Sequence, residues 1–132
     1  MRVSITEDFK AIFKTLSRND QLKVSKFIQH VKTHGMKNLA GRNKSSDHVP
    51  SSNPQWLARA RYAQKNNLWH YHIGIPNYVG NKYGDLTSQY IVHYVKQDGF
   101  IRLVDLSTHP PFQLPSINKL QSTDISSLSD SD

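Results

Sequence analysis

The chain has 132 residues, which is enough for one domain built on a single hydrophobic core. It carries 17 lysines and arginines against 10 aspartates and glutamates, for a formal net charge of +7. Three of the aspartates lie in residues 121–132, which hold no basic residue, so residues 1–120 are more basic still. A body this basic predicts attraction to a polyanion such as RNA, DNA, an acidic protein or an anionic membrane.

The absence of cysteine excludes a disulfide framework, a thiol nucleophile and cysteine-ligated zinc. The N-terminal residues lack the unbroken apolar stretch of a signal peptide. No run approaches the ~20 apolar residues that a membrane helix needs. We therefore expect a cytoplasmic protein that has no membrane partner.

Two apolar stripes with helical spacing follow a short predicted strand at residues 2–6. Thr6 is a candidate cap for the first helix, and Asp20 is a candidate cap for the second. Both stripes have the i, i+3, i+4, i+7 spacing of a helix that packs one face on a core: Phe9, Ile12, Phe13 and Leu16, then Val24, Phe27, Ile28 and Val31. The sequence predicts two short antiparallel helices joined by a tight turn.

Residues 35–55 lose this periodicity and are rich in Gly, Ser, Asn and Pro. Loops of this length are uncommon in compact domains unless they are functional or disordered. The segment carries the basic side chains Lys37, Arg42 and Lys44 and the imidazole of His48. It is interpreted as a long surface loop, either a solvated linker or a binding loop.

From residue 56 onward the apolar period changes to two, which is typical of strands. "WLARARYA" at 56–63 is assigned to a strand on this basis, and "LWHYHIGIP" at 68–76 is assigned to the next. Two further strands flank Asp98-Gly99, a strong hairpin signal. We predict an α+β fold in which an antiparallel sheet of about four to five strands packs on the two-helix hairpin. Residues 1–120 form the single domain, and the Ser/Asp-rich tail 121–132 is expected to be disordered.

The segment at 68–76 places two histidines on one face and large apolar residues on the other. Trp69, Tyr71 and two isoleucines form the apolar row that helices would cover, which leaves His70 and His72 on the open face with side chains at least partly exposed. Imidazole can take or give a proton near neutral pH. Without a metal, RNA cleavage needs a base for the 2′-OH, an acid for the 5′-oxygen and cations for the phosphorane charge.

Further residues could complete such a site. His93 and His109 lie in or just after the hairpin strands and could face the same groove. Arg102, on the second hairpin strand, and either Arg61 or Lys44 are candidate cations. Each histidine could instead be an ordinary hydrogen-bonded or surface residue.

The His-x-His pair is also a metal-ligand pattern, because alternate strand residues share a face. A third ligand would have to come from His93, Asp85, Asp105 or His109, none of which has a diagnostic spacing. No glycine-rich phosphate loop is present either. We therefore predict neither a metal nor a cofactor.

Four segments together resemble a known family. They are "GRNKSSD" at 41–47, "LWHYHIGIP" at 68–76, "GDLTSQYIVHY" at 84–94 and "IRLVDLSTHPPF" at 101–112. In type and order they are similar to segments of the RelE/ParE superfamily of small bacterial toxins, and within it of the YafO-like mRNA interferases. The resemblance covers roughly residues 1–115. The connection "NYVGNKYGDLTSQ" at 77–89 departs from the tight turn of compact RelE members.

This resemblance implies the toxin of a type II toxin–antitoxin system, an mRNA endoribonuclease that acts on the ribosome and is held inactive by a cognate antitoxin. It places the functional surface at Arg42, His70, His72, Asp85, Ser88, Tyr90, His93 and His109. With the candidates above, the expected catalytic residues are His70, His72, His93, Arg102 and His109. The expected RNA contacts are Arg42, Lys44, Arg61, Asp85, Ser88 and Tyr90.

The competing class is a protein of the same fold that does no chemistry. It would be a ParE-like toxin that binds a protein target such as gyrase, or a plain nucleic-acid-binding module. A nucleic-acid-binding module would more naturally present stacking aromatic rings on the open face than histidines.

Overall fold

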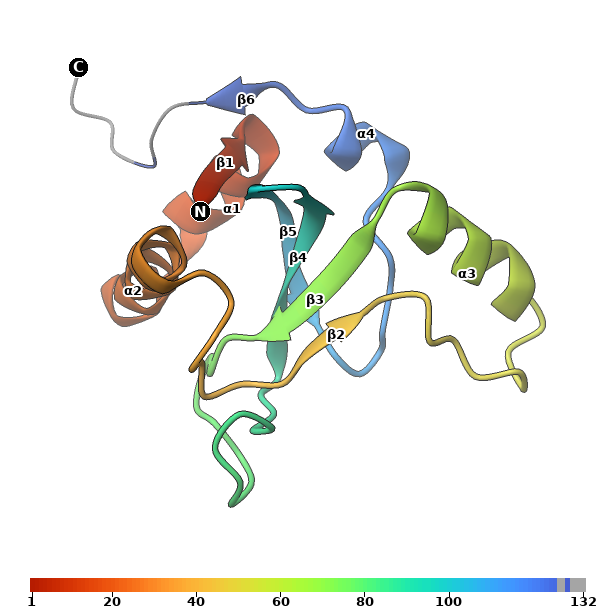
Figure 1. The fold of residues 1–132 in the computed structure, drawn as a ribbon, viewed down its shortest axis with the longest axis horizontal. Helices are drawn as coiled ribbons and strands as arrows, with labels where there is room; N and C mark the ends of the chain where they lie inside the picture. The colour runs from red at the N-terminus through yellow and green to blue at the C-terminus, as the bar shows by residue number, and fades with distance from the viewer. Residues whose placement is uncertain (126–127, 129–132) are drawn as a thin grey trace.

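A computed structural model describes residues 1–125 and residue 128 of the chain (Figure 1). The predicted α+β class is confirmed. Its elements, in chain order, are β1 (Arg2–Thr6), α1 (Glu7–Thr15), α2 (Arg18–His34), β2 (Asn43–Ser45), α3 (Trp56–Lys65), β3 (Leu68–His72), β4 (Tyr90–Gln97), β5 (Phe100–Thr108), α4 (Ile117–Leu120) and β6 (Asp124–Ile125).

The strands form one six-stranded sheet in the order β2-β3-β4-β5-β1-β6. The β4–β5 hairpin turns at Asp98-Gly99 as predicted. The sheet is mixed, because β1 runs parallel to β5 while the other pairs are antiparallel. The prediction of a purely antiparallel sheet of four to five strands was therefore wrong in detail. The prediction named no partner strand for β1, and it did not include the two short edge strands β2 and β6.

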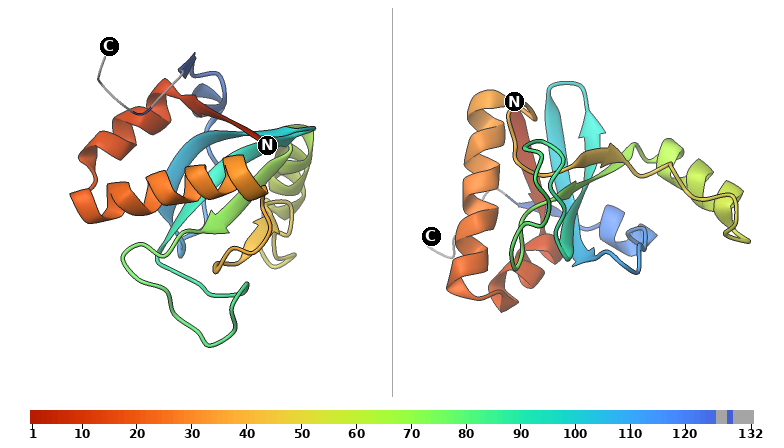
Figure 2. Two further views of the ribbon diagram at one scale, coloured as in Figure 1. Left: turned by 60° about the vertical axis from the view of Figure 1, so that its left-hand side comes forward. Right: turned by 90° about the horizontal axis from the view of Figure 1, so that it is seen from below.

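Helices α1 and α2 lie on one face of the sheet and bury their predicted stripes there (Figure 2). Phe9, Val24 and Val31 are almost fully buried against sheet residues that include Tyr71. Thr6 caps α1 as predicted, since its Oγ1 accepts the Phe9 N–H at 3.1 Å. Helix α2 begins one turn earlier than predicted, because Ser17, rather than Asp20, supplies the capping hydroxyl.

The opposite face of the sheet is not open, which corrects a second expectation. Residues 56–65 form helix α3 rather than a strand, and Ala63 packs with Leu68 and Val104 on that face. Alanine, arginine and glutamine favour a helix, and one buried helical face outweighs the weak period-two pattern of 56–63. The right-hand view of Figure 2 shows the sheet between α1 and α2 on one side and α3 and α4 on the other.

Two segments expected to be irregular contain ordered pairing. Residues 43–45, inside the predicted long loop, form β2 against β3. Residues 121–125 were assigned to a disordered tail, but Asp124 and Ile125 form β6 against β1. The rest of that tail, apart from residue 128, lies outside the described residues. In the described part of the chain, no helix is long and apolar enough to cross a membrane.

Candidate active site

His70 and His72 point away from α1 and α2, as the alternation of β3 predicted. The prediction that they are partly exposed was wrong, because only 6% and 4% of these residues is accessible. The chain that leaves β5 folds back over them. The ring centroid of His109 lies 6.0 Å from that of His70 and 5.7 Å from that of His72. The ring centroid of Phe112 lies 4.8 Å from that of His70.

This covering segment leaves a cavity of about 280 Å³ above β3, which we call the histidine cavity. Its walls come from the segment around β2, from β3 and from the segment after β5. The lining residues are Arg42, Lys44, Ser46, His48, Pro50, His70, His72, His109 and Phe112. Four histidines, one arginine and one lysine therefore line one small cavity.

Both β3 histidines are fixed through Nδ1. The Nδ1 of His70 lies 2.8 Å from the buried Oγ of Ser46. The Nδ1 of His72 lies 3.0 Å from both the backbone N and the backbone O of Ser88. The Ser88 N–H donates to a neutral His72 ring, and the Ser88 carbonyl accepts from a protonated one. Each ring therefore keeps Nε2 free of partners among the described residues.

Burial lowers the pKa of His70, His72 and His109. Desolvation, followed by the charges of His93, His109 and His72, lowers the pKa of His70 to about 3. Desolvation is also the main cause of the lowered pKa of His72 and of His109. These three imidazoles are mostly neutral at pH 7, because their pKa values are lowered from 6.5, so the positive charge beside them comes from Arg42 and Lys44.

His93 lies behind the cavity rather than in its wall. It is fully buried opposite His70 in the β3–β4 register, and its Nε2 lies 2.7 Å from Ser107 Oγ. Burial lowers the pKa of His93 to about 3. Its Nδ1, like that of His109, is buried without a hydrogen-bond partner among the described residues. His93 therefore supports the cluster from within and does not reach the cavity.

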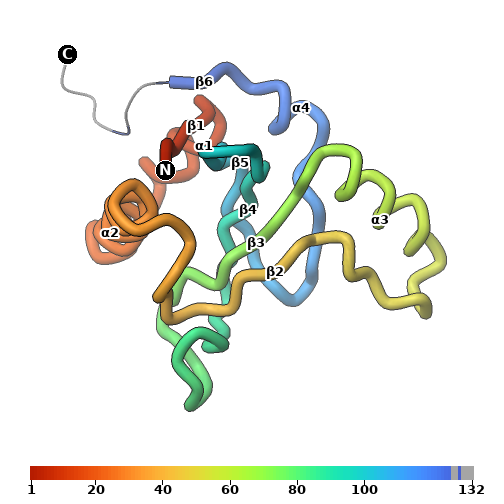
Figure 3. Tube along the Cα trace, viewed as in Figure 1, coloured from red at the N-terminus to blue at the C-terminus, as the bar shows by residue number. Residues whose placement is uncertain are grey.

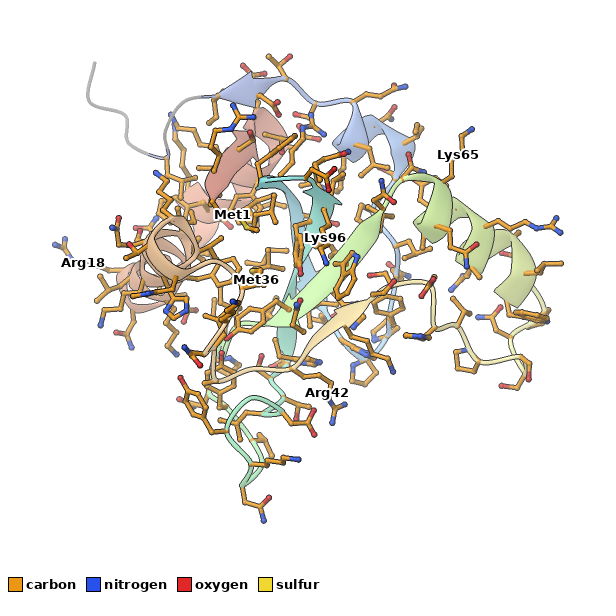
Figure 4. All side chains as sticks on the ribbon, in the orientation of Figure 1. Met1, Arg18, Met36, Arg42, Lys65 and Lys96 are labelled. Atoms are coloured by element: carbon orange, nitrogen blue, oxygen red, sulfur yellow. The ribbon has the colours of Figure 1, made fainter. Side chains whose placement is uncertain are left out.

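Arg42 reaches the cavity because Gly41 allows its segment to lie flat on β3. A Cβ on Gly41 would fall 1.9 Å from the His72 carbonyl oxygen, and the His72 N–H donates to the Arg42 carbonyl at 3.0 Å. The Arg42 guanidinium binds the Asp85 carboxylate through Nε at 2.7 Å and Nη2 at 3.3 Å. Figure 4 shows Arg42 beside β2 at this edge of the molecule.

The other predicted site residues divide into those near the cavity and those away from it. Ser88 anchors His72 and Asp85 pairs with Arg42, so both support the site without lining it. Tyr90 packs against the core on the α1/α2 side. Arg61 lies on the surface of α3 and does not line the cavity.

Arg102 is not part of the site, which corrects its expected catalytic role. Its Nε donates to Asp124 at 2.6 Å, its Nη1 donates to the Leu120 carbonyl at 2.5 Å, and its Nη2 donates to the Ser122 carbonyl. Arg102 lies instead towards the β1–β6 edge of the sheet. There its charge holds the C-terminal segment in place.

Two contributors were missed from the sequence. Phe112 contacts three histidine rings, and the aromatic in "HPPF" next to His109 was a usable signal for it. Ser46 had no signal, since one serine in a serine-rich loop cannot be distinguished from its neighbours. Among the residues that the structure describes, no three His, Asp or Glu side chains are arranged to hold a metal ion.

Comparison of the chain with protein-family models, with curated proteins and with solved structures gave no match.

Proposed function

We propose that this protein is an endoribonuclease that cleaves single-stranded mRNA by general acid–base catalysis without a metal. The observation that carries the proposal is the histidine cavity, where His70 and His72 are fixed through Nδ1 beside Arg42 and Lys44. Two oriented imidazoles and two cations are the groups that phosphodiester transfer within RNA requires.

The roles follow from the hydrogen bonds. His70 can donate Nδ1–H to Ser46, which leaves a lone pair on Nε2 to take the proton of the 2′-OH. The 2′-oxygen then bonds to phosphorus, and the phosphorane charge lies next to Arg42 and Lys44. The bond to the 5′-oxygen breaks as that oxygen accepts the Nε2 proton of protonated His72. The products are a 2′,3′-cyclic phosphate and a 5′-hydroxyl.

His72 must be protonated for the last step, although burial lowers its pKa. A bound phosphate brings a negative charge close to the ring, and an opposite charge within ~4–6 Å favours the charged imidazole. The Ser88 carbonyl, 3.0 Å from Nδ1, is placed to accept the second proton of that cation. Substrate binding therefore favours the protonated form of His72 that acts as the acid.

The biological setting is proposed from the resemblance of the segments at 41–47, 68–76, 84–94 and 101–112 to the RelE/ParE superfamily. In that setting the protein is a type II toxin, its substrate is mRNA on the ribosome, and its inhibitor is a cognate antitoxin. The strongly basic body supports an RNA partner, because lysine and arginine neutralise backbone phosphates.

The test compares wild type with His70→Gln and His72→Gln on ribosome-bound mRNA and on free single-stranded RNA. Loss of a positioned acid or base should slow cleavage about 10²–10⁴-fold. His34→Gln, on α2 outside the cavity, is the matched control and should cleave normally. Cleavage of free RNA should survive EDTA, and expression in cells should cause growth arrest with loss of mRNA.

Three outcomes would contradict the proposal. Cleavage that survives both histidine substitutions would show that His70 is not the base and His72 is not the acid. Growth arrest with DNA damage and intact mRNA would favour a ParE-like toxin that binds a protein target. Activity that is lost in EDTA and restored by zinc alone would favour a metal held by the same histidines.

A further inference from the structure

A second cavity lies on the other side of β3 from the histidine cavity. Its volume is about 410 Å³, and it is lined by α2, the residues that follow α2, β3 and the segment 76–87. We call it the tyrosine cavity, and the side chains that characterise it are Lys23, Lys26, His30, Tyr71, Tyr78 and Tyr83. Figure 3 shows residues 76–87 as a long excursion beyond β2 and β3.

Tyr83 is exposed and yet held in place. Its residue is 68% accessible, although tyrosine is large and mostly apolar. Its hydroxyl donates to the Asn38 carbonyl at 2.8 Å, which ties segment 76–87 to the residues after α2. A fixed ring with open faces is suited to stack on a nucleobase at little cost in conformational entropy.

The charge around the tyrosine cavity is positive. Lys23 Nζ donates to the Gly74 carbonyl at 3.0 Å and to that of Pro76, and its nearest carboxylate, Asp20, is 3.9 Å away. Lys26 lines the same wall from the exposed side of α2. Among the described lining residues there is no aspartate or glutamate, so the charged side chains of the lining, Lys23 and Lys26, would attract an anionic group.

Hydrogen bonds connect the two cavities through β3. The Tyr78 hydroxyl donates to the His72 carbonyl at 2.9 Å and lies 2.8 Å from the Tyr71 hydroxyl. Ala40 lines the tyrosine cavity and Arg42 lines the histidine cavity, so only Gly41 separates them, and two residue steps span about 7 Å if extended. One flexible strand can therefore contact both cavities around this edge.

We infer that the tyrosine cavity binds a nucleotide of the same RNA strand, a few nucleotides from the bond cleaved in the histidine cavity. The base stacks on Tyr83, and Lys26 contacts a neighbouring phosphate. This inference rests on the proposed nuclease function, and it makes segment 76–87 an RNA-binding arm.

The test measures binding of uncleavable 2′-O-methyl single-stranded oligoribonucleotides of three and eight nucleotides. Loss of base stacking in Tyr83→Ala should weaken binding of the eight-mer about five- to a hundredfold and leave the three-mer unchanged. Tyr83→Phe keeps the ring and should retain most of the affinity. Lys26→Gln should lower the slope of log affinity against log salt by about 0.7, whereas Lys65→Gln on α3 should not change binding.

The same variants separate binding from chemistry. With cleavable RNA, Tyr83→Ala should raise KM without changing kcat. The inference would be overturned if Tyr83→Ala bound each oligonucleotide as tightly as wild type does. It would also be overturned if Tyr83→Ala lost as much affinity for the three-mer as for the eight-mer. Tyr83-dependent binding of the eight-mer by a wild type that cleaves no RNA would remove the nuclease function and keep the nucleotide site.

Discussion

The Cα of Gly41 packs so closely on His72 that a methyl group built on it would lie 1.9 Å from the His72 carbonyl oxygen. This contact aligns the segment before β2 with β3, and the Gly41 N–H also donates to the Tyr71 hydroxyl at 3.0 Å. Glycine at position 41 is therefore what brings Arg42 to the histidine cavity.

The first prediction is that Gly41→Ala destabilises the protein by about 1–3 kcal/mol, since backbone must move to admit the methyl group. RNA binding should weaken as well, because Arg42 moves with it. Gly99→Ala is the control: its turn has free space but a φ of +79°, so it should cost about 1 kcal/mol and leave RNA binding unchanged. Thermal unfolding and oligonucleotide affinity measure the two effects.

The second prediction concerns Ser46, which is a positioning residue for His70. Ser46→Ala removes the Nδ1 partner of a buried ring, so stability should fall by about 1–3 kcal/mol. Cleavage should slow, and the pH–rate profile should shift because the preferred tautomer of His70 is no longer fixed. Ser45→Ala, whose hydroxyl binds Asp47 instead, should keep the wild-type profile. An unchanged profile for Ser46→Ala would show that Ser46 has only a packing role.

The third prediction concerns acid stability. The folded-state pKa values of His70 and His93 are lowered to about 3, against an ordinary value of 6.5. The unfolded chain therefore binds more protons below pH 6.5. The stabilisation that comes from keeping these two rings neutral is complete above that pH, and it is lost as the pH falls from about 6.5 towards 3. At pH 5 each ring should lower the free energy of unfolding by on the order of 2 kcal/mol relative to its value above pH 6.5.

Urea unfolding between pH 8 and pH 4 measures this loss. His93→Gln should flatten the acid side of the curve. Tyr94→Phe removes a buried hydroxyl that donates to Asn43, so it should lower stability by a similar amount at every pH. Parallel curves for wild type and His93→Gln would contradict the prediction.

The fourth prediction concerns the ion pair at the cavity mouth. Asp85 occupies the Arg42 guanidinium, and its side chain is 50% exposed, so a substrate phosphate can replace it. Asp85→Asn should tighten RNA binding by about two- to fivefold, the range expected for losing one surface ion-pair competitor. Asp98→Asn, in the β4–β5 turn, removes an equal charge away from the site and should have a smaller effect. Equal effects of both variants would indicate only a change in net charge.

The local elements of this fold were predictable because their patterns are local. Each correct prediction depends on residues that lie close together in the sequence: the stripes of α1 and α2, the alternation of β3 and the Asp98-Gly99 hairpin. The exposure of His70 was not predictable, because His109 and Phe112 cover it from nearly 40 residues further along the chain. The histidines of the candidate site were thus selected by residue type, whereas their burial depends on long-range packing.

Arg102 shows the same limit. It lies opposite Val95 in the β4–β5 register. Nothing in the neighbouring sequence indicated that residues 120–124 would return to that point. A basic residue on a predicted hairpin strand was therefore assigned to catalysis, although its three partners belong to the C-terminal segment.

The fifth prediction follows from this correction. Arg102→Ala should lower the free energy of unfolding by about 2–4 kcal/mol, because a largely buried guanidinium loses charge-assisted bonds to Leu120, Ser122 and Asp124. Asp124→Asn, which removes only the exposed partner, should cost less. Cleavage per folded molecule, measured well below the melting temperature of each variant, should equal that of wild type. A drop of tenfold or more in kcat for Arg102→Ala with normal stability would instead return Arg102 to the active site.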